Sequence, residues 1–158
     1  MTSCEAIAGR LQEVLPDGKW IANTNYLQQI ESVTWEQATQ KIEDLNTIHT
    51  LTYHINYYIA GMLNVFNGGN LEIRDKYSFD APPINSEVEW QALIKTFVSN
   101  AQKFVLHVRQ MKDSKLNEAF VHKKYGTYLR NIEGVIEHVY YHLGQVSLIK
   151  KLVEGSAN

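Results

Sequence analysis

The chain has 158 residues, of which 44% are hydrophobic and 20% are charged, so its length and composition predict one globular domain over residues 1–158. Its 15 basic and 17 acidic side chains leave a net charge of −2, which excludes the strongly basic surface of a nucleic-acid-binding protein. The single cysteine, Cys4, excludes an intramolecular disulfide, and the longest apolar run, 57–66, is too short to span a membrane.

The first segments of the chain predict short helices joined by a connector. Residues 2–5 have the form of a capping box, in which a Thr and a Glu side chain bond each other's backbone N–H groups. They predict a helix that ends before Pro16, since proline cannot continue a helix interior. Residues 17–34 then form a connector, in which 26–30 is expected to make a short helical turn.

A second capping box at 34–37 predicts a helical stretch that runs to Phe66. That stretch is long for a globular domain, so we expect a break near residues 44–46. The Asn-Gly-Gly sequence at 67–69 supplies residues that adopt positive φ, and it predicts the end of the helix.

Two further helices are predicted in the second half, separated by long connectors. Residues 70–85 read as a polar loop, Ser86 begins a helix to about Met111, and 113–127 form a second connector before a helix over 128–153. The apolar positions of the third long helix follow a 3.6-residue period: Trp90, Leu93, Ile94, Phe97, Ala101, Phe104, Val105 and Val108. These patterns predict an all-α four-helix bundle with long connectors.

His138 and His142 form the most informative pair of residues. A spacing of four residues places two side chains about 40° apart around a helix and about 6 Å apart along it, so both imidazoles can meet one metal ion. Gln145 lies on the same face and could bond a ligand imidazole or a metal-bound water. The zinc-protease motif HExxH is absent because Val139 stands where its Glu would be. Spacing alone also fits two histidines that serve only as surface or core residues.

A third ligand must come from another helix, and His49 and His54 are the candidates. They are five residues apart and so cannot both face one site. The neighbours of His49 on the helix are more polar than those of His54, which are Leu51, Tyr58, Gly61 and Val65. We therefore expect His54 to point inward, with space beside it at Gly61; the alternative is a buried histidine bonded to a backbone carbonyl. His107 and His122 have no partner at a useful spacing and are expected on the surface.

The sequence of these histidine segments resembles a known family. Residues 138–146, His-Val-Tyr-Tyr-His-Leu-Gly-Gln-Val, resemble the last helix of the DinB-like (DinB/YfiT-like) metalloenzymes, whose pattern is H-x-x-[YF]-H-x-G-Q-[IV]. Residues 48–58 resemble that family's second helix, which carries a lone ligand histidine before an aromatic-rich run. Residues 18–20 and 34–38 match the usual approach to that helix, so the resemblance spans most of the chain.

The resemblance implies a four-helix bundle that holds one divalent metal ion, Zn²⁺ or Ni²⁺, on His54, His138 and His142. Characterised relatives include enzymes that depend on a low-molecular-weight thiol, such as mycothiol-dependent maleylpyruvate isomerase and bacillithiol S-transferases, and members are commonly homodimers. One departure is Val139, where relatives often carry Asp.

Three histidines leave a coordination position open, as in catalytic rather than structural metal sites. We therefore expect a divalent-metal-dependent enzyme acting on a small molecule, such as a thiol-dependent S-transferase or a related hydrolase or isomerase. The alternatives are a non-enzymatic metal- or small-ligand-binding stress-response protein, and a bundle whose histidines only pack. Glu133 and Glu137 do not share the histidine face closely enough to be assigned as a base. The lone cysteine and the lack of a signal peptide predict a cytoplasmic location.

Overall fold

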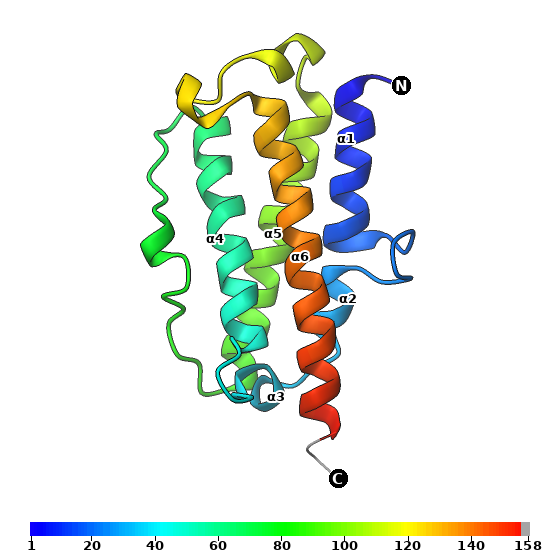
Figure 1. Cartoon of the computed structure of the whole chain (residues 1–158), viewed down its shortest axis with the longest axis vertical. Helices are drawn as coiled ribbons and strands as arrows, with labels where there is room; N and C mark the ends of the chain where they lie inside the picture. Colours follow the sequence, from blue (N-terminus) through cyan, green and yellow to red (C-terminus); the bar gives the residue numbers. More distant parts are fainter. Residues whose placement is uncertain (156–158) are drawn as a thin grey trace.

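The computed structural model describes residues 1–155 and is built from helices and their connections (Figure 1). The α-helices are α1 (Ser3–Gln12), α2 (Tyr26–Glu31), α3 (Trp35–Thr39), α4 (Ile48–Phe66), α5 (Glu87–Gln110) and α6 (Tyr128–Gly155). No β-strand occurs in residues 1–155, where Ala119 and Thr127 form an isolated bridge. The predicted all-α class is confirmed.

The longest helices of the bundle are α4, α5 and α6 (Figure 1). Helices α4, α5 and α6 lie side by side, while α1 and α2 follow one another along α5 and α6. One position of the bundle is therefore shared by two helices rather than filled by one continuous helix. The N-terminus and the last described residue lie at opposite ends of the molecule.

The helix boundaries follow their capping residues. Thr2 and Thr34 each form the predicted capping box, and Ser86 accepts a hydrogen bond from the backbone N–H of Glu89 at the start of α5. The break before α4 is wider than predicted: residues 40–47 are non-helical, and Thr47 caps α4 afresh. Gly68 has the positive φ expected where α4 ends, at 89°.

The first helix, α1, ends at Gln12, before Pro16 as predicted, but the helical path continues beyond it. The chain does not leave the helical path before Pro16, because α1 passes directly into a wider π-helical turn over Glu13–Asp17 that contains the proline. The turn ends at Gly18, whose backbone is extended. Pro16 removes one backbone hydrogen-bond donor, but the helical path ends only after it.

The core confirms the apolar period predicted for α5. All eight predicted positions except Leu93, which is half-buried, lie in the hydrophobic core. Trp90 is fully buried, and its indole Nε1–H donates to the carbonyl of Val33 at 3.2 Å. This bond satisfies the indole's one polar group inside the core.

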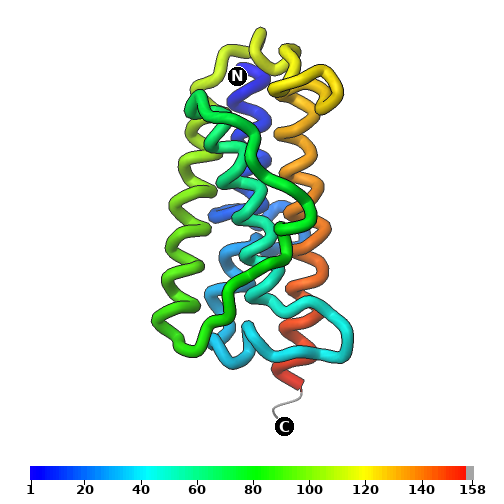
Figure 2. The backbone as a smooth tube through the Cα atoms, turned by 90° about the vertical axis from the view of Figure 1, so that its left-hand side faces the viewer, coloured from blue at the N-terminus to red at the C-terminus, as the bar shows by residue number. Residues whose placement is uncertain are grey.

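The connector between α4 and α5 runs along the outer side of α4 for most of its length (Figure 2). We call residues 67–86 the strap. It contains one short 3₁₀ turn, Asp75–Tyr77, and it ends at the cap of α5. Among the described residues, no helix is long and apolar enough to cross a membrane.

Candidate metal centre

Three histidines from two helices converge between α4 and α6. His54 comes from α4, whereas His138 and His142 lie one turn apart on α6. The Nε2 atom of His138 is 2.9 Å from that of His54 and 2.8 Å from that of His142. One ligand atom from each of the three lies within 4.8 Å of the others, so the group could hold a metal ion.

The second ring nitrogens determine which atoms face the centre. Nδ1 of His54 is 3.2 Å from the carbonyl oxygen of Ser78, and Nδ1 of His142 is 2.6 Å from Oε1 of Gln145. Because both partners are oxygen acceptors, each Nδ1–H donates, and each neutral ring directs the lone pair of Nε2 inward. Such bonds are the usual outer support of metal-ligating histidines, and Gln145 has the contact predicted for it.

The donor set fits a metal ion better than it fits hydrogen bonding. A neutral His138 carries at most one proton on Nε2 and so cannot donate to both neighbouring Nε2 atoms. A cation at the centre would satisfy all three lone pairs at once. Tetrahedral Zn²⁺ with Zn–N bonds of about 2.05 Å separates its ligand nitrogens by about 3.3 Å. The two separations that involve His138, 2.9 and 2.8 Å, lie close to that value.

The protonation of the site suits metal binding. Burial, followed by the charges of His142 and His54, lowers the pKa of His138 to about 4. Burial also lowers the pKa of His54 and of His142, which are each only 5% exposed. All three imidazoles are therefore neutral at pH 7, the state in which histidine binds a metal.

In the metal-free protein, we expect the free energy of unfolding to fall as the pH is lowered from about 6.5 to about 4. His138 titrates near pH 6.5 when unfolded but near 4 when folded, so between these values the unfolded chain binds more protons. Urea denaturation at about pH 7 and about pH 5 should show a smaller loss for His138→Gln than for the unaltered protein. His122→Gln, at an exposed position, is the control. An equal loss in all three proteins would contradict this assignment.

The strap holds His54 in place. The ring of Phe79 stacks on the His54 imidazole with centroids 3.8 Å apart and planes at 10°, and Ser78 supplies the carbonyl described above. Tyr58 meets the same imidazole edge-on and donates its hydroxyl to Asp75 at 2.7 Å. No periodic pattern in the sequence marks Ser78 or Phe79. The sequence predicts residues 70–85 only as a polar loop.

We expected Gly61 to leave open space beside His54. Instead, the absence of a side chain at Gly61 makes room for the strap. A Cβ atom at Gly61 would overlap with the side chain of Ile73 in the strap. One turn earlier, the hydroxyl of Tyr57 accepts from the backbone N–H of Arg74 at 2.9 Å and lies 3.2 Å from its carbonyl. Helix α4 therefore binds the strap through a hydroxyl and a close approach at its surface.

We expect Phe79→Ala to weaken metal binding about tenfold, because residues that orient a ligand imidazole typically contribute ten- to a hundredfold in affinity. Competition with a chromophoric chelator measures the affinity. Tyr77→Ala is a matched control, since Tyr77 lies in the same strap and is 45% exposed, against 44% for Phe79. Equal affinities in all three proteins would mean that stacking by the strap does not orient His54.

A cleft of about 450 Å³ is lined by one of the three histidines, His138. Its walls come from α4, α6 and the second connector: Tyr58, Met62, Tyr125, Arg130, Asn131, Gly134, Val135 and His138. A neighbouring cleft of about 460 Å³ shares Tyr58, Met62, Tyr125 and Asn131 and extends along the strap. His138 is thus the ligand candidate that a small molecule in the cleft would meet first.

The remaining histidines lie away from this centre. His49 is only 6% exposed and meets the ring of Trp90 edge-on, so the side of α4 judged more polar is buried as well. His107, expected on the surface, is half-buried and stacks on Phe66 with centroids 4.9 Å apart. His122 is exposed, as predicted.

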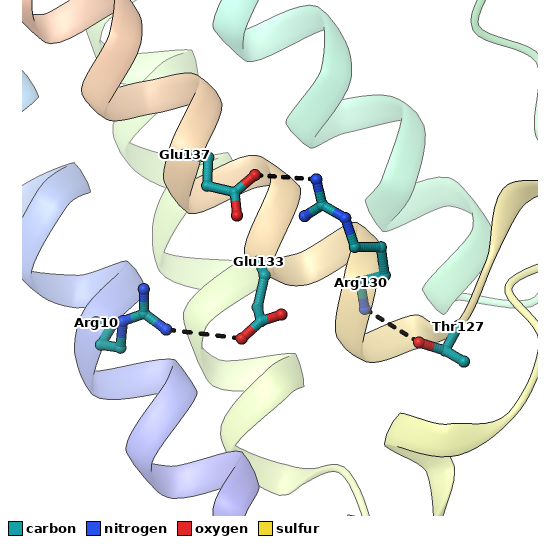
Figure 3. A network of polar contacts seen from close by, with 5 residues as sticks. All are labelled: Arg10, Thr127, Arg130, Glu133 and Glu137. Carbon is teal, nitrogen blue, oxygen red and sulfur yellow. Dashed lines mark hydrogen bonds and ion pairs between the residues drawn. The ribbon is translucent and has the colours of Figure 1, made fainter.

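The cysteine and the two glutamates considered in the sequence contact residues outside the histidine centre. Cys4 is buried, and burial together with Asp113 raises the pKa of its thiol to about 11, so the thiol is protonated and unreactive near neutral pH. Glu133 pairs with Arg10 at 3.9 Å and Glu137 with Arg130 at 3.0 Å (Figure 3). Both carboxylates are thus engaged with arginines.

One comparison with known proteins identifies a family. A family model described as the DinB superfamily matches residues 21–145, a segment that contains His54, His138, His142 and Gln145. No curated protein and no solved structure matched the chain. Since the family match covers most of the sequence and the structure is all-α, the chain belongs to the DinB superfamily.

Proposed function

We propose that this protein is a divalent-metal-dependent enzyme that binds Zn²⁺ or Ni²⁺ on His54, His138 and His142 and acts on a low-molecular-weight thiol. An S-transferase fits this description, as does a related hydrolase or isomerase. The observation that carries the proposal is the convergence of three Nε2 atoms, two of which are directed inward by bonds from Nδ1 to oxygen. Imidazole ligands suit both metals.

The proposed chemistry needs an open coordination position and access to it. Three protein ligands leave such a position, and a metal bound there supplies a Lewis-acid site that keeps a thiol deprotonated near neutral pH. The chain's own residues orient the imidazoles through Ser78 and Gln145 and give the thiol a path along the cleft beside His138. The cleft favours an enzyme over a closed structural site.

Elemental analysis of protein purified without a histidine tag tests the metal centre. We expect about one Zn or Ni ion per chain, and none in the double variant His138→Ala/His142→Ala. A second double variant, His107→Ala/His122→Ala, removes two histidines elsewhere and should keep the metal. If the unaltered protein holds no metal even after reconstitution, or if the first double variant retains it, the metal centre proposed here is wrong.

A second candidate function is a metal- or small-ligand-binding protein without catalytic activity, and the same donor set supports it. The two are separated by a screen of the metal-loaded protein with cellular thiols and an electrophilic acceptor, in which loss of thiol and formation of a thioether are followed by mass spectrometry. Turnover that disappears in His54→Ala supports the enzyme. Metal binding without turnover of any thiol supports the binding protein.

A further inference from the structure

The cleft beside His138 contains a cationic side chain that the metal centre does not use. Arg130 contributes to its wall, together with the polar side chains of Tyr125 and Asn131. The other lining residues besides His138 are Tyr58, Met62, Gly134 and Val135, which are aromatic, apolar or without a side chain. The cleft thus combines a cationic side chain, apolar surface and one candidate metal ligand.

Arg130 is placed to reach toward the histidines. Its backbone N–H donates to Thr127 at the start of α6, and it precedes His138 by eight residues, or about 12 Å along the helix. The side chain extends along α6 to Glu137, the residue before His138 (Figure 3). Its Nη1 would be 3.7 Å from a Cβ at Gly134, so the guanidinium lies above a part of the cleft wall that has no side chain.

The contact with Glu137 leaves the guanidinium available for a ligand. Both side chains are about 60% exposed, and exposed ion pairs contribute little to stability, so a carboxylate in the cleft can compete with or join Glu137. Arginine carries five N–H donors, of which the Glu137 contact uses Nη2. The other carboxylate near the cleft, Asp75, accepts the hydroxyl of Tyr58.

Hydrogen bonds hold the second connector in place where it lines the cleft. The side-chain amide of Asn131 donates to the backbone carbonyls of Tyr125 and Thr127, each at 2.8 Å. These bonds hold the 3₁₀ turn Lys123–Tyr125 against the first turn of α6. A ligand carboxylate would therefore meet a preorganised pocket rather than a mobile loop end.

We propose that Arg130 binds the carboxylate of the small-molecule substrate, whose reactive end lies at the three histidines. This inference rests on the proposed function and specifies its substrate class: a short aliphatic acid that carries a metal-binding group such as a thiol at its other end. Met62 and Val135 provide the apolar contact for the connecting carbons. Arg130 acts as a specificity-determining residue in this arrangement.

The test uses protein loaded with Co²⁺, whose visible absorption changes when a ligand enters its coordination sphere. Mercaptobutyrate and mercaptobutanol share a thiol and a chain length and differ in charge. We expect the acid to bind about tenfold more tightly than the alcohol, as a charge-assisted contact of this kind predicts, and Arg130→Gln to remove that preference. Arg10→Gln is the matched control, since Arg10 pairs with Glu133 on the side of α6 that faces α1 (Figure 3).

Two other results separate this inference from the proposed function. Glutarate, titrated in parallel, tests the carboxylate site without a thiol: if it binds in an Arg130-dependent way while neither thiol does, the thiol chemistry fails and the carboxylate site stands. Equal affinities for acid and alcohol in the unaltered protein overturn the inference, as does an equal loss of preference in the two arginine variants. If Co²⁺ itself does not bind, the proposed function fails first.

Discussion

Removal of the proposed metal by a chelator is expected to lower the melting temperature of the protein by about 10 °C. A ligand at a thousandfold its dissociation constant stabilises the folded state by about 4 kcal/mol. For a domain of this size, each kcal/mol corresponds to about 2–4 °C in melting temperature. The two α6 histidines and the one α4 histidine are brought together only in the folded state, so the unfolded chain should gain little from the metal.

Differential scanning calorimetry with added Zn²⁺ and with chelator measures the effect in matched variants. His54→Ala removes one of the three converging nitrogens and should abolish the difference between the two scans. His122→Ala alters an exposed histidine and should preserve it. A metal-dependent shift that persists in His54→Ala would mean that the stabilising ion binds elsewhere.

Val139→Asp is expected to lower the free energy of unfolding by roughly 3–5 kcal/mol, the range found when a charge is left unpaired in a protein interior. Val139 is fully buried in the apolar core, one residue after the first α6 histidine. Members of the family that this chain resembles often carry Asp at this position. The substitution therefore tests whether the surroundings of residue 139 in this chain accept a carboxylate. Urea denaturation gives the free energy.

Val88→Asp is the control for this substitution. Val88 is 79% exposed in the first turn of α5, where an added negative charge should change stability by no more than about 0.5 kcal/mol. A loss in Val139→Asp as small as that of the control would show that the carboxylate finds a partner. The metal affinity of Val139→Asp would then identify the histidine centre as that partner or exclude it.

The parts of the fold that the sequence predicts correctly are those governed by local chemistry. The capping side chains of Thr2, Thr34 and Ser86 bond backbone atoms only three residues away, and each marks a helix start. The apolar period of α5 similarly depends on the geometry of one helix. The convergence of His138 and His142 has the same origin, because one helical turn brings them together.

Predictions that depend on distant segments were less successful. His54, chosen over His49 because its neighbours are less polar, is the α4 histidine that meets His138, but polarity does not distinguish the two since both are buried. Helix α4 is covered by α5, α6 and α3 and also by the strap, so few of its positions face solvent. The contact between Phe79 and His54 joins an irregular segment to a helix, and no periodicity in the sequence encodes such a contact.

The histidine arrangement also affects how the chain can open. His54 and His138 are 84 residues apart, so an ion shared by them closes a loop that contains the strap, α5 and the second connector. In the metal-free protein α4 can separate from α6 by local unfolding, whereas a bound ion links the two helices as a cross-link would. Metal loading should therefore slow amide hydrogen exchange in α4 and α6, and also in α5, which supplies none of the three histidines.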